Sequence, residues 1–199
     1  MLILIIGLIL FLGMHSARIF APDFRDGFIR ARGENAWKGL YTVVSLVGFG
    51  MIIWGFSMAR LNTPVLYVPP TWLTHVNLLF MLFSFILLAV YGMPPGRIKA
   101  AVKHPMLAAV KLWAFGHLLA NGDLASVLLF GSFLVWAIAD RISVKRRTAG
   151  GHEPEMAIGP VRNDIAAIIA GIVVYVLFVW KLHAWLFGVA PVVFQSTGG

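Results

Sequence analysis

Long apolar segments dominate this chain of 199 residues and constrain its fold more than any other feature. A helix that crosses the hydrocarbon core of a bilayer needs roughly 20 apolar residues, because that core is about 30 Å thick. The segments that approach this length are Leu2–Phe20, Trp37–Met58, Trp72–Tyr91, Ile98–Ala120, Leu124–Asp140 and Asn163–Phe187. The sequence therefore predicts an all-α integral membrane protein, a bundle of six transmembrane helices that forms a single domain over residues 1–199.

The composition fits a membrane protein and excludes several other classes. Hydrophobic residues make up 60% of the chain and charged residues 12%, too few charges to cover a soluble domain of this length. The chain has no cysteine, which excludes disulfides, thiolate ligands and cysteine nucleophiles. The net charge of +8 would suggest nucleic acid in a soluble protein, but here it is expected from basic loops that face anionic lipid. We therefore expect a lipid bilayer as partner and no nucleic acid.

Basic residues gather in alternate loops and so predict the orientation. The first, third and fifth loops contain Arg18, Arg25, Arg30, Arg32 and Lys38, then Arg97, Lys99 and Lys103, and then Arg141, Lys145, Arg146, Arg147 and Arg162. The second loop has only Arg60, and the fourth loop and the C-terminal tail have none. By the positive-inside rule the odd loops are cytoplasmic. This predicts a multi-pass protein of the bacterial inner (plasma) membrane with both termini periplasmic.

Tryptophans near the ends of the predicted spans are expected to form an interfacial aromatic belt. They are Trp37, Trp54, Trp72, Trp136 and Trp185.

Histidines are the residues best placed to carry chemistry, because the common motifs of soluble enzymes are missing. No Gly-rich phosphate loop, H-E-x-x-H or G-x-S-x-G is present. His152 falls in a loop, and His75 and His183 fall near the outer ends of spans. His15, His104 and His117 lie inside or at the margins of spans, where an imidazole binds haem iron in many membrane cytochromes or forms an interhelical hydrogen bond. Both roles stay open at this point.

Helix geometry limits how these histidines combine. His104 and His117 are 13 residues apart, which on one continuous helix is about 20 Å along the axis and about 140° around it. They cannot both bind one iron, so another helix, such as the one that ends near His15, must supply the second ligand. His104 is expected at about the same depth in the membrane as His15, so predicted depth favours His104 over His117 as the partner of His15. Lys111 follows His104 by 7 residues on the same face, where it can snorkel, pair with a propionate or line a polar cavity.

Several segments resemble the NnrU family, which is related to plant and cyanobacterial zeta-carotene isomerase. They are "FLGMHSARIFAP", "WKGLYTVVSLVGF", "KHPMLAAVKLWAFGHLLANGDLASVLLFGSFLVWAIAD" and "RISVKRR", and the resemblance covers nearly the whole chain. It implies a membrane protein that holds haem b, with axial ligands at positions matching His15 and His117. It also implies a role in nitric oxide and denitrification metabolism, or a haem-dependent cis–trans isomerase acting on a hydrophobic polyene.

The resemblance leaves two details of the site to be decided. The isomerase has a cysteine, considered as an alternative ligand, three positions before its second histidine, and here that position is Ala114. The family names His117 as the second ligand, whereas predicted depth names His104. Arg18 or the neighbouring basic loop is a candidate partner for haem propionates, because guanidinium groups pair well with carboxylates.

Two other functions remain open from the sequence, so whether the protein is an enzyme is undecided. Lys103-His104-Pro105, Asn121 and Arg141 are similar to residues of isoprenylcysteine-type methyltransferases, which use S-adenosylmethionine. The paired glutamates expected after that arginine are replaced by the basic run 145–147. A non-catalytic assembly factor for a respiratory complex would leave the histidines with a structural role.

Overall fold

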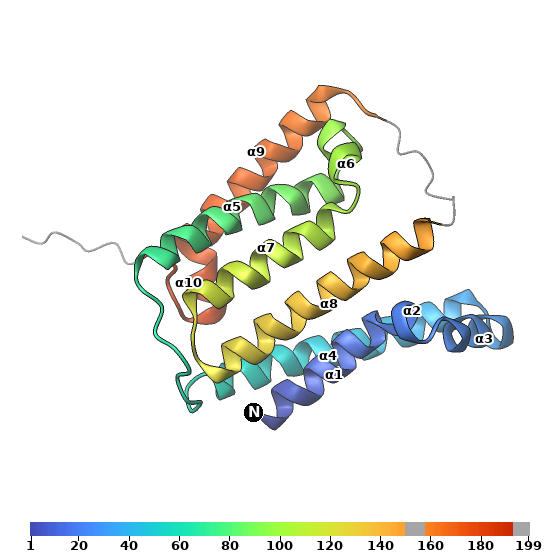
Figure 1. The fold of residues 1–199 in the computed structure, drawn as a ribbon, viewed down its shortest axis with the longest axis horizontal. Coiled ribbons are helices and arrows are strands. Elements are labelled where there is room, and N and C mark those ends of the chain that lie inside the picture. The colour runs from blue at the N-terminus through green and yellow to red at the C-terminus, as the bar shows by residue number, and fades with distance from the viewer. Residues whose placement is uncertain (150–157, 193–199) are drawn as a thin grey trace, which may run out of the picture. The chain divides into compact units, whose positions relative to one another are not determined.

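The computed structural model describes residues 1–149 and 158–192, and in this part of the chain the fold is all-helical (Figure 1). Four helices have the length and composition to cross a membrane: α4 (Glu34–Ala59), α5 (Trp72–Gly92), α8 (Leu124–Thr148) and the continuous segment Val161–Phe187. The other two predicted spans correspond to shorter apolar helices, α1 (Leu2–His15) and α7 (Pro105–Ala120). The all-α fold with membrane-type helices is confirmed, and the count of six spans stays a prediction.

The chain divides into two compact units. Unit 1 consists of Met1–Val68 and the described part of Asn121–Glu153, and unit 2 of Pro69–Ala120 and the described part of Pro154–Gly199. Unit 1 contains α1, α2 (Ala17–Phe20), α3 (Pro22–Arg32), α4 and α8. Unit 2 contains α5, α6 (Arg97–Val102), α7, α9 (Val161–Leu177), the π-helical turn η1 (Phe178–Leu182) and α10 (His183–Phe187).

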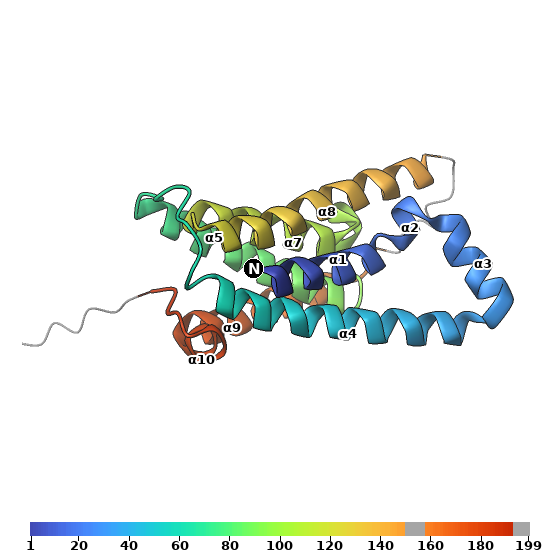
Figure 2. The same ribbon diagram turned by 90° about the horizontal axis from the view of Figure 1, so that it is seen from below.

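In unit 1, α1 runs antiparallel along α4 with the two backbones in close contact (Figure 2). Glycines make this approach possible. A Cβ added to Gly7 would lie 2.7 Å from the backbone nitrogen of Ile52, and one added to Gly48 would lie 2.7 Å from that of Phe11. Small residues are the usual means of helix association in lipid, where apolar contact alone gives little preference for another helix over an acyl chain.

The first basic loop is largely helical, which corrects its prediction as a loop. Pro22 occupies the first turn of α3, where its fixed φ and missing N–H are favourable. Phe24 and Phe28 pack edge-on against Trp37 of α4, with ring centroids 6.4 and 5.7 Å away. Trp37 is buried, whereas Trp54, Trp72 and Trp185 are exposed as expected for an interfacial belt. At the other basic end, α8 continues to Thr148, eight residues beyond the predicted Asp140.

The loop between α4 and α5 is held to the start of α8 by hydrogen bonds. Leu66 and Tyr67 donate their N–H groups to the carbonyl of Gly122, and the Tyr67 hydroxyl donates to the carbonyl of Asn121 at 2.8 Å. Burial, with a smaller contribution from the nearby Asp123 carboxylate, raises the pKa of Tyr67. The hydroxyl therefore stays protonated and able to donate at neutral pH.

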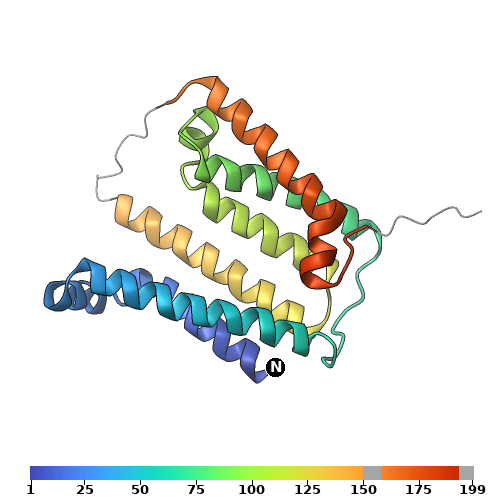
Figure 3. The same cartoon turned by 180° about the vertical axis from the view of Figure 1, so that it is seen from behind.

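In unit 2, α5 lies between α7 and α9 and packs against both (Figure 3). The buried Ser84 of α5 donates its hydroxyl to the carbonyl of Ala109 on α7 at 3.0 Å. A Cβ added to Gly171 of α9 would lie 2.5 Å from the Cα of Ile86. As in unit 1, a glycine allows two helices to approach closely, and in unit 2 a side-chain hydrogen bond adds a polar contact.

The predicted continuous helix Ile98–Ala120 is wrong, because the chain breaks between α6 and α7. Lys103 has φ 62° and ψ −47°, and His104 donates its N–H to the carbonyl of Val102 at 2.7 Å. This is a γ-turn of the rare, strained type with positive φ. Pro105 explains the break, since proline lacks an N–H and disfavours a helical conformation in the residue before it. The 20 Å and 140° separation of His104 and His117, and the shared face of His104 and Lys111, therefore do not hold.

A buried carboxylate accepts hydrogen bonds from the N-terminus of α6. Asp164 of α9 is 7% exposed and accepts the N–H groups of Arg97 and Ile98, at 2.9 and 3.0 Å. Beside it, Asn163 donates its amide to the carbonyl of Pro95 at 2.8 Å. The two bonds to Asp164 satisfy N–H groups in the first turn of α6, which have no partner within the helix.

Replacing Gly48 by alanine should lower the free energy of unfolding by about 1–3 kcal/mol, because the new methyl group meets the α1 backbone. Gly50 is the matched control on the same helix, since a Cβ there meets nothing within 4 Å. Gly50→Ala should leave stability unchanged or raise it by up to about 1 kcal/mol through helix propensity. Unfolding in mixed micelles, followed by circular dichroism, measures both, and equal effects would contradict the close packing of α1 on α4.

Replacing Asp164 by alanine should lower the free energy of unfolding by about 2 kcal/mol, because two buried N–H groups of α6 lose their charged acceptor. The control is Asp26→Ala, which removes an exposed ion pair with Arg25 of the kind worth about 0–1 kcal/mol. The same unfolding titration compares them. A loss from Asp164→Ala no larger than from the control would show that the carboxylate does not hold α6.

Candidate functional site

His15 is the last residue of α1, and its own helix fixes the orientation of its ring. Its Nδ1 donates to the carbonyl of Phe11, one turn earlier, at 2.7 Å. A carbonyl oxygen can only accept a hydrogen bond, so Nδ1 carries the proton and the lone pair of the neutral ring lies on Nε2. Histidines that ligate metals use this arrangement, in which a hydrogen bond at one ring nitrogen sets the tautomer and raises the basicity of the other.

Aromatic side chains from three helices surround the His15 ring. The ring stacks on Phe11 with centroids 4.2 Å apart, and it lies 5.0 Å from the ring of Tyr41 and 5.9 Å, edge-on, from that of Trp136. Trp136 was predicted to belong to the interfacial belt, and this packing corrects that assignment. Its indole Nε1 is buried and has no hydrogen-bond partner within the described residues, which marks a donor able to serve a ligand.

An apolar hollow of about 510 Å³ lies beside this aromatic cluster, between α1–α2 and α8. Trp136 belongs to both the cluster and the hollow wall. The rest of the wall is Leu12, Ser16, Phe20, Val127, Leu128, Gly131, Ser132, Val135 and Ala139. The volume is within the usual range for small-molecule sites, so this part of unit 1 can hold an apolar ligand next to an oriented imidazole.

His117, on α7 of unit 2, repeats the arrangement of His15. Its Nδ1 donates to the carbonyl of Trp113 at 2.8 Å, and the two rings lie 5.5 Å apart. The preceding residue, Gly116, is approached closely by Asn77 of α5, whose buried Oδ1 has no hydrogen-bond partner among the described residues. In both helices an aromatic residue four positions earlier supplies the carbonyl and the neighbouring ring.

The remaining predicted site residues are distributed over both units. Arg18 lies exposed on α2, one turn after His15 in unit 1. Lys111 is partly buried on α7, and His104 is partly buried just before that helix, both in unit 2. The structure thus groups His15 with Arg18 in one unit and His104, Lys111 and His117 in the other.

Sequence reasoning missed the side chains that surround His15, and only one of them carried a signal. Phe11 stands four residues before His15, as Trp113 does before His117, and this spacing is visible in the sequence. Tyr41 and Trp136 come from distant helices, and nothing in the sequence indicated that they lie beside His15. His183, predicted to be interfacial, also donates from Nδ1, to the carbonyl of Val189 at 2.7 Å. His152 lies outside the described residues.

The described residues contain no group of three or more histidine, aspartate or glutamate side chains that could hold a metal ion.

Comparison with known proteins identifies a family. The family model described as NnrU protein matches residues 3–191, nearly the whole chain. No curated protein and no solved structure matched significantly.

The neutral rings of His15 and His117 should both carry their proton on Nδ1, because each donates from that nitrogen to a helix carbonyl. Long-range proton–nitrogen NMR correlations on protein with isotope-labelled histidine report the tautomer of each ring. His75, exposed on α5, serves as the control and should show the exchange-averaged mixture of a solvated ring. A proton on Nε2 of His15 or His117 would rule out the orientation described above.

Proposed function

Because the chain belongs to the NnrU family, we propose that it binds haem b, with His15 and His117 as the axial ligands. The observation that carries the proposal is the hydrogen bond from Nδ1 of each imidazole to the carbonyl four residues earlier. That bond leaves Nε2 as the ligating atom and holds the ring in one orientation.

The residues around His15 suit a flat, apolar cofactor with carboxylate substituents. The hollow beside the aromatic cluster is walled mostly by hydrocarbon and by the Trp136 ring, so it offers apolar contact to a bound macrocycle. The buried Nε1 of Trp136 is a donor without a partner within the described residues. Arg18, one turn after His15, can pair with a propionate at the membrane surface.

Each residue in the proposal has a defined task. His15 and His117 would supply electron pairs from Nε2, and the carbonyls of Phe11 and Trp113 would keep the rings oriented and basic. When bound, haem supplies an iron centre whose redox state and coordination decide between electron transfer, gas binding and substrate activation. His104 is kept as the reserve ligand, and Lys111 as a second cation for a propionate.

The proposed biological role is in nitric oxide and denitrification metabolism, or in haem-dependent cis–trans isomerisation of a hydrophobic polyene. The proposal includes a six-span, single-domain protein of the bacterial inner membrane with periplasmic termini. Its basis is the alternation of basic and non-basic loops along the sequence.

Purified full-length protein should show a Soret band. His15→Ala and His117→Ala should each lower the amount of haem per protein by at least about tenfold. Loss of a contact that only orients a ligand already costs about 10–100-fold in metal affinity, and loss of the ligand itself should cost no less. Absorption spectra of oxidised and reduced protein measure this. His75→Ala is the matched control, since that exposed ring should leave the spectrum unchanged.

The His104→Ala variant separates the two candidates for the second ligand. Loss of the Soret band in this variant, with retention in His117→Ala, would identify His104 instead. Protein that purifies without haem and binds S-adenosylmethionine in a calorimeter would overturn the proposal in favour of a methyltransferase.

A further inference from the structure

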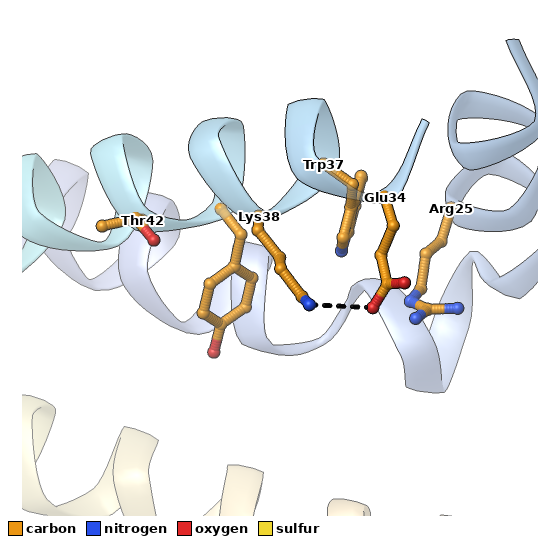
Figure 4. Close-up of a pocket in the computed structure, with 6 residues that line it drawn as sticks. Arg25, Glu34, Trp37, Lys38 and Thr42 are labelled. Carbon is orange, nitrogen blue, oxygen red and sulfur yellow. Dashed lines mark ion pairs between the residues drawn. The ribbon is translucent and has the colours of Figure 1, made fainter. Parts of the chain in front are cut away.

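A polar hollow of about 260 Å³ lies between α3 and the first turns of α4, apart from the apolar hollow described above (Figure 4). Its lining is Arg25, Glu34, Trp37, Lys38, Tyr41 and Thr42. The two cations come from different helices, Arg25 from α3 and Lys38 from α4. Neither the family match nor the proposed haem site assigns a role to this hollow.

Glu34 stands between the two cations and interacts with both (Figure 4). The Lys38 ammonium lies 3.0 Å from its carboxylate, and both side chains are about two-thirds exposed, at 66% and 64%. Arg25 also pairs with the exposed Asp26 at 2.7 Å. Exposed ion pairs contribute only about 0–1 kcal/mol, so either cation can exchange its carboxylate for another anion at little cost.

The surroundings of the hollow combine charged and exposed apolar side chains, as expected where a helix enters the hydrocarbon layer. Trp37 is buried and forms part of the wall, while Phe24, which packs on it, is 63% exposed. On α4 the exposed Leu40 and Val43 follow within five residues of Lys38, a rise of about 7.5 Å along the helix. Such a position suits a group that is anionic at one end and apolar at the other.

We propose that this hollow binds the headgroup of an anionic phospholipid, with the phosphate diester on Arg25 and Lys38 and the acyl chains along Phe24 and the apolar face of α4. Glu34 occupies the two cations in the absence of lipid and competes with the phosphate for them. This binding site shares Tyr41 with the aromatic cluster around His15, but its two cations are not part of the proposed haem site, and the proposal does not depend on haem binding.

Native mass spectrometry of the full-length protein in detergent, titrated with phosphatidylglycerol or with phosphatidylcholine of identical acyl chains, tests the proposal. Wild-type protein should bind the anionic lipid more tightly. Arg25→Gln and Lys38→Gln should each weaken that binding at least about tenfold, since each loses a direct contact with the phosphate, and a hydrogen bond to a charged group is worth about 1.5–3 kcal/mol. Glu34→Gln should tighten it several-fold because the competitor is removed.

The matched control is Arg30→Gln, which removes an exposed arginine of α3 that does not line the hollow. It should weaken binding by no more than about fivefold, which corresponds to the roughly 1 kcal/mol expected of any basic residue at the membrane surface. If all three basic variants weaken binding equally, the lipid is attracted by the overall positive charge of α3 and α4 and is not bound at a defined site. Weaker binding of phosphatidylglycerol by Glu34→Gln would also overturn the proposal. The tighter binding expected of this variant cannot result from misfolding, because misfolding would weaken binding.

Inorganic phosphate in excess separates a lipid site from a site for free phosphate. Phosphatidylglycerol adducts should persist when phosphate is added, because the acyl chains contribute to binding. Their displacement by phosphate alone would identify a soluble anion as the ligand and overturn the assignment to lipid.

Discussion

Backbone hydrogen bonding in an apolar medium is the constraint on which the rest of this structure depends. A chain surrounded by lipid must satisfy its own N–H and C=O groups, and helices do this within one segment. Wherever a helix ends, the chain has to supply a partner from elsewhere. At α6 the partner is the buried carboxylate of Asp164, which accepts from Arg97 and Ile98. At the other end of α6, His104 donates to Val102 across a strained turn. The ends of helices are therefore where the polar chemistry of the protein is concentrated.

The candidate ligands also form hydrogen bonds with backbone groups, but with carbonyls inside their own helices. His15 and His117 each donate to a carbonyl of their own helix, so the ring is oriented without help from a neighbouring element. Packing then distinguishes the two positions. Around His15 the rings of Tyr41 and Trp136 complete an aromatic wall next to an apolar hollow. An oriented imidazole beside aromatic and apolar side chains is the arrangement on which the proposed cofactor site rests.

The errors of sequence interpretation have local causes. The period and length of apolar runs predicted a continuous helix through His104, but proline at position 105 breaks it. The same reasoning treated the first basic loop only as a connection between spans and did not predict α3, whose Phe24 and Phe28 pack on Trp37. Helix α8 runs past Asp140, since lysine and arginine are good helix formers and favour a helix C-terminus.

The sequence by itself determined the all-helical class, the membrane character of the long helices, the family, and the histidines that deserve a functional test. All of these depend on composition, periodicity and spacing along a single segment. Only the tertiary structure decided which groups meet: Trp136 with His15, Asp164 with α6, and Arg25 with Lys38 around one hollow. These contacts join residues that are far apart in the sequence or lie on different helices. Their formation depends on how closely the helices pack, and that distance is set by the glycines and side chains of two partners together.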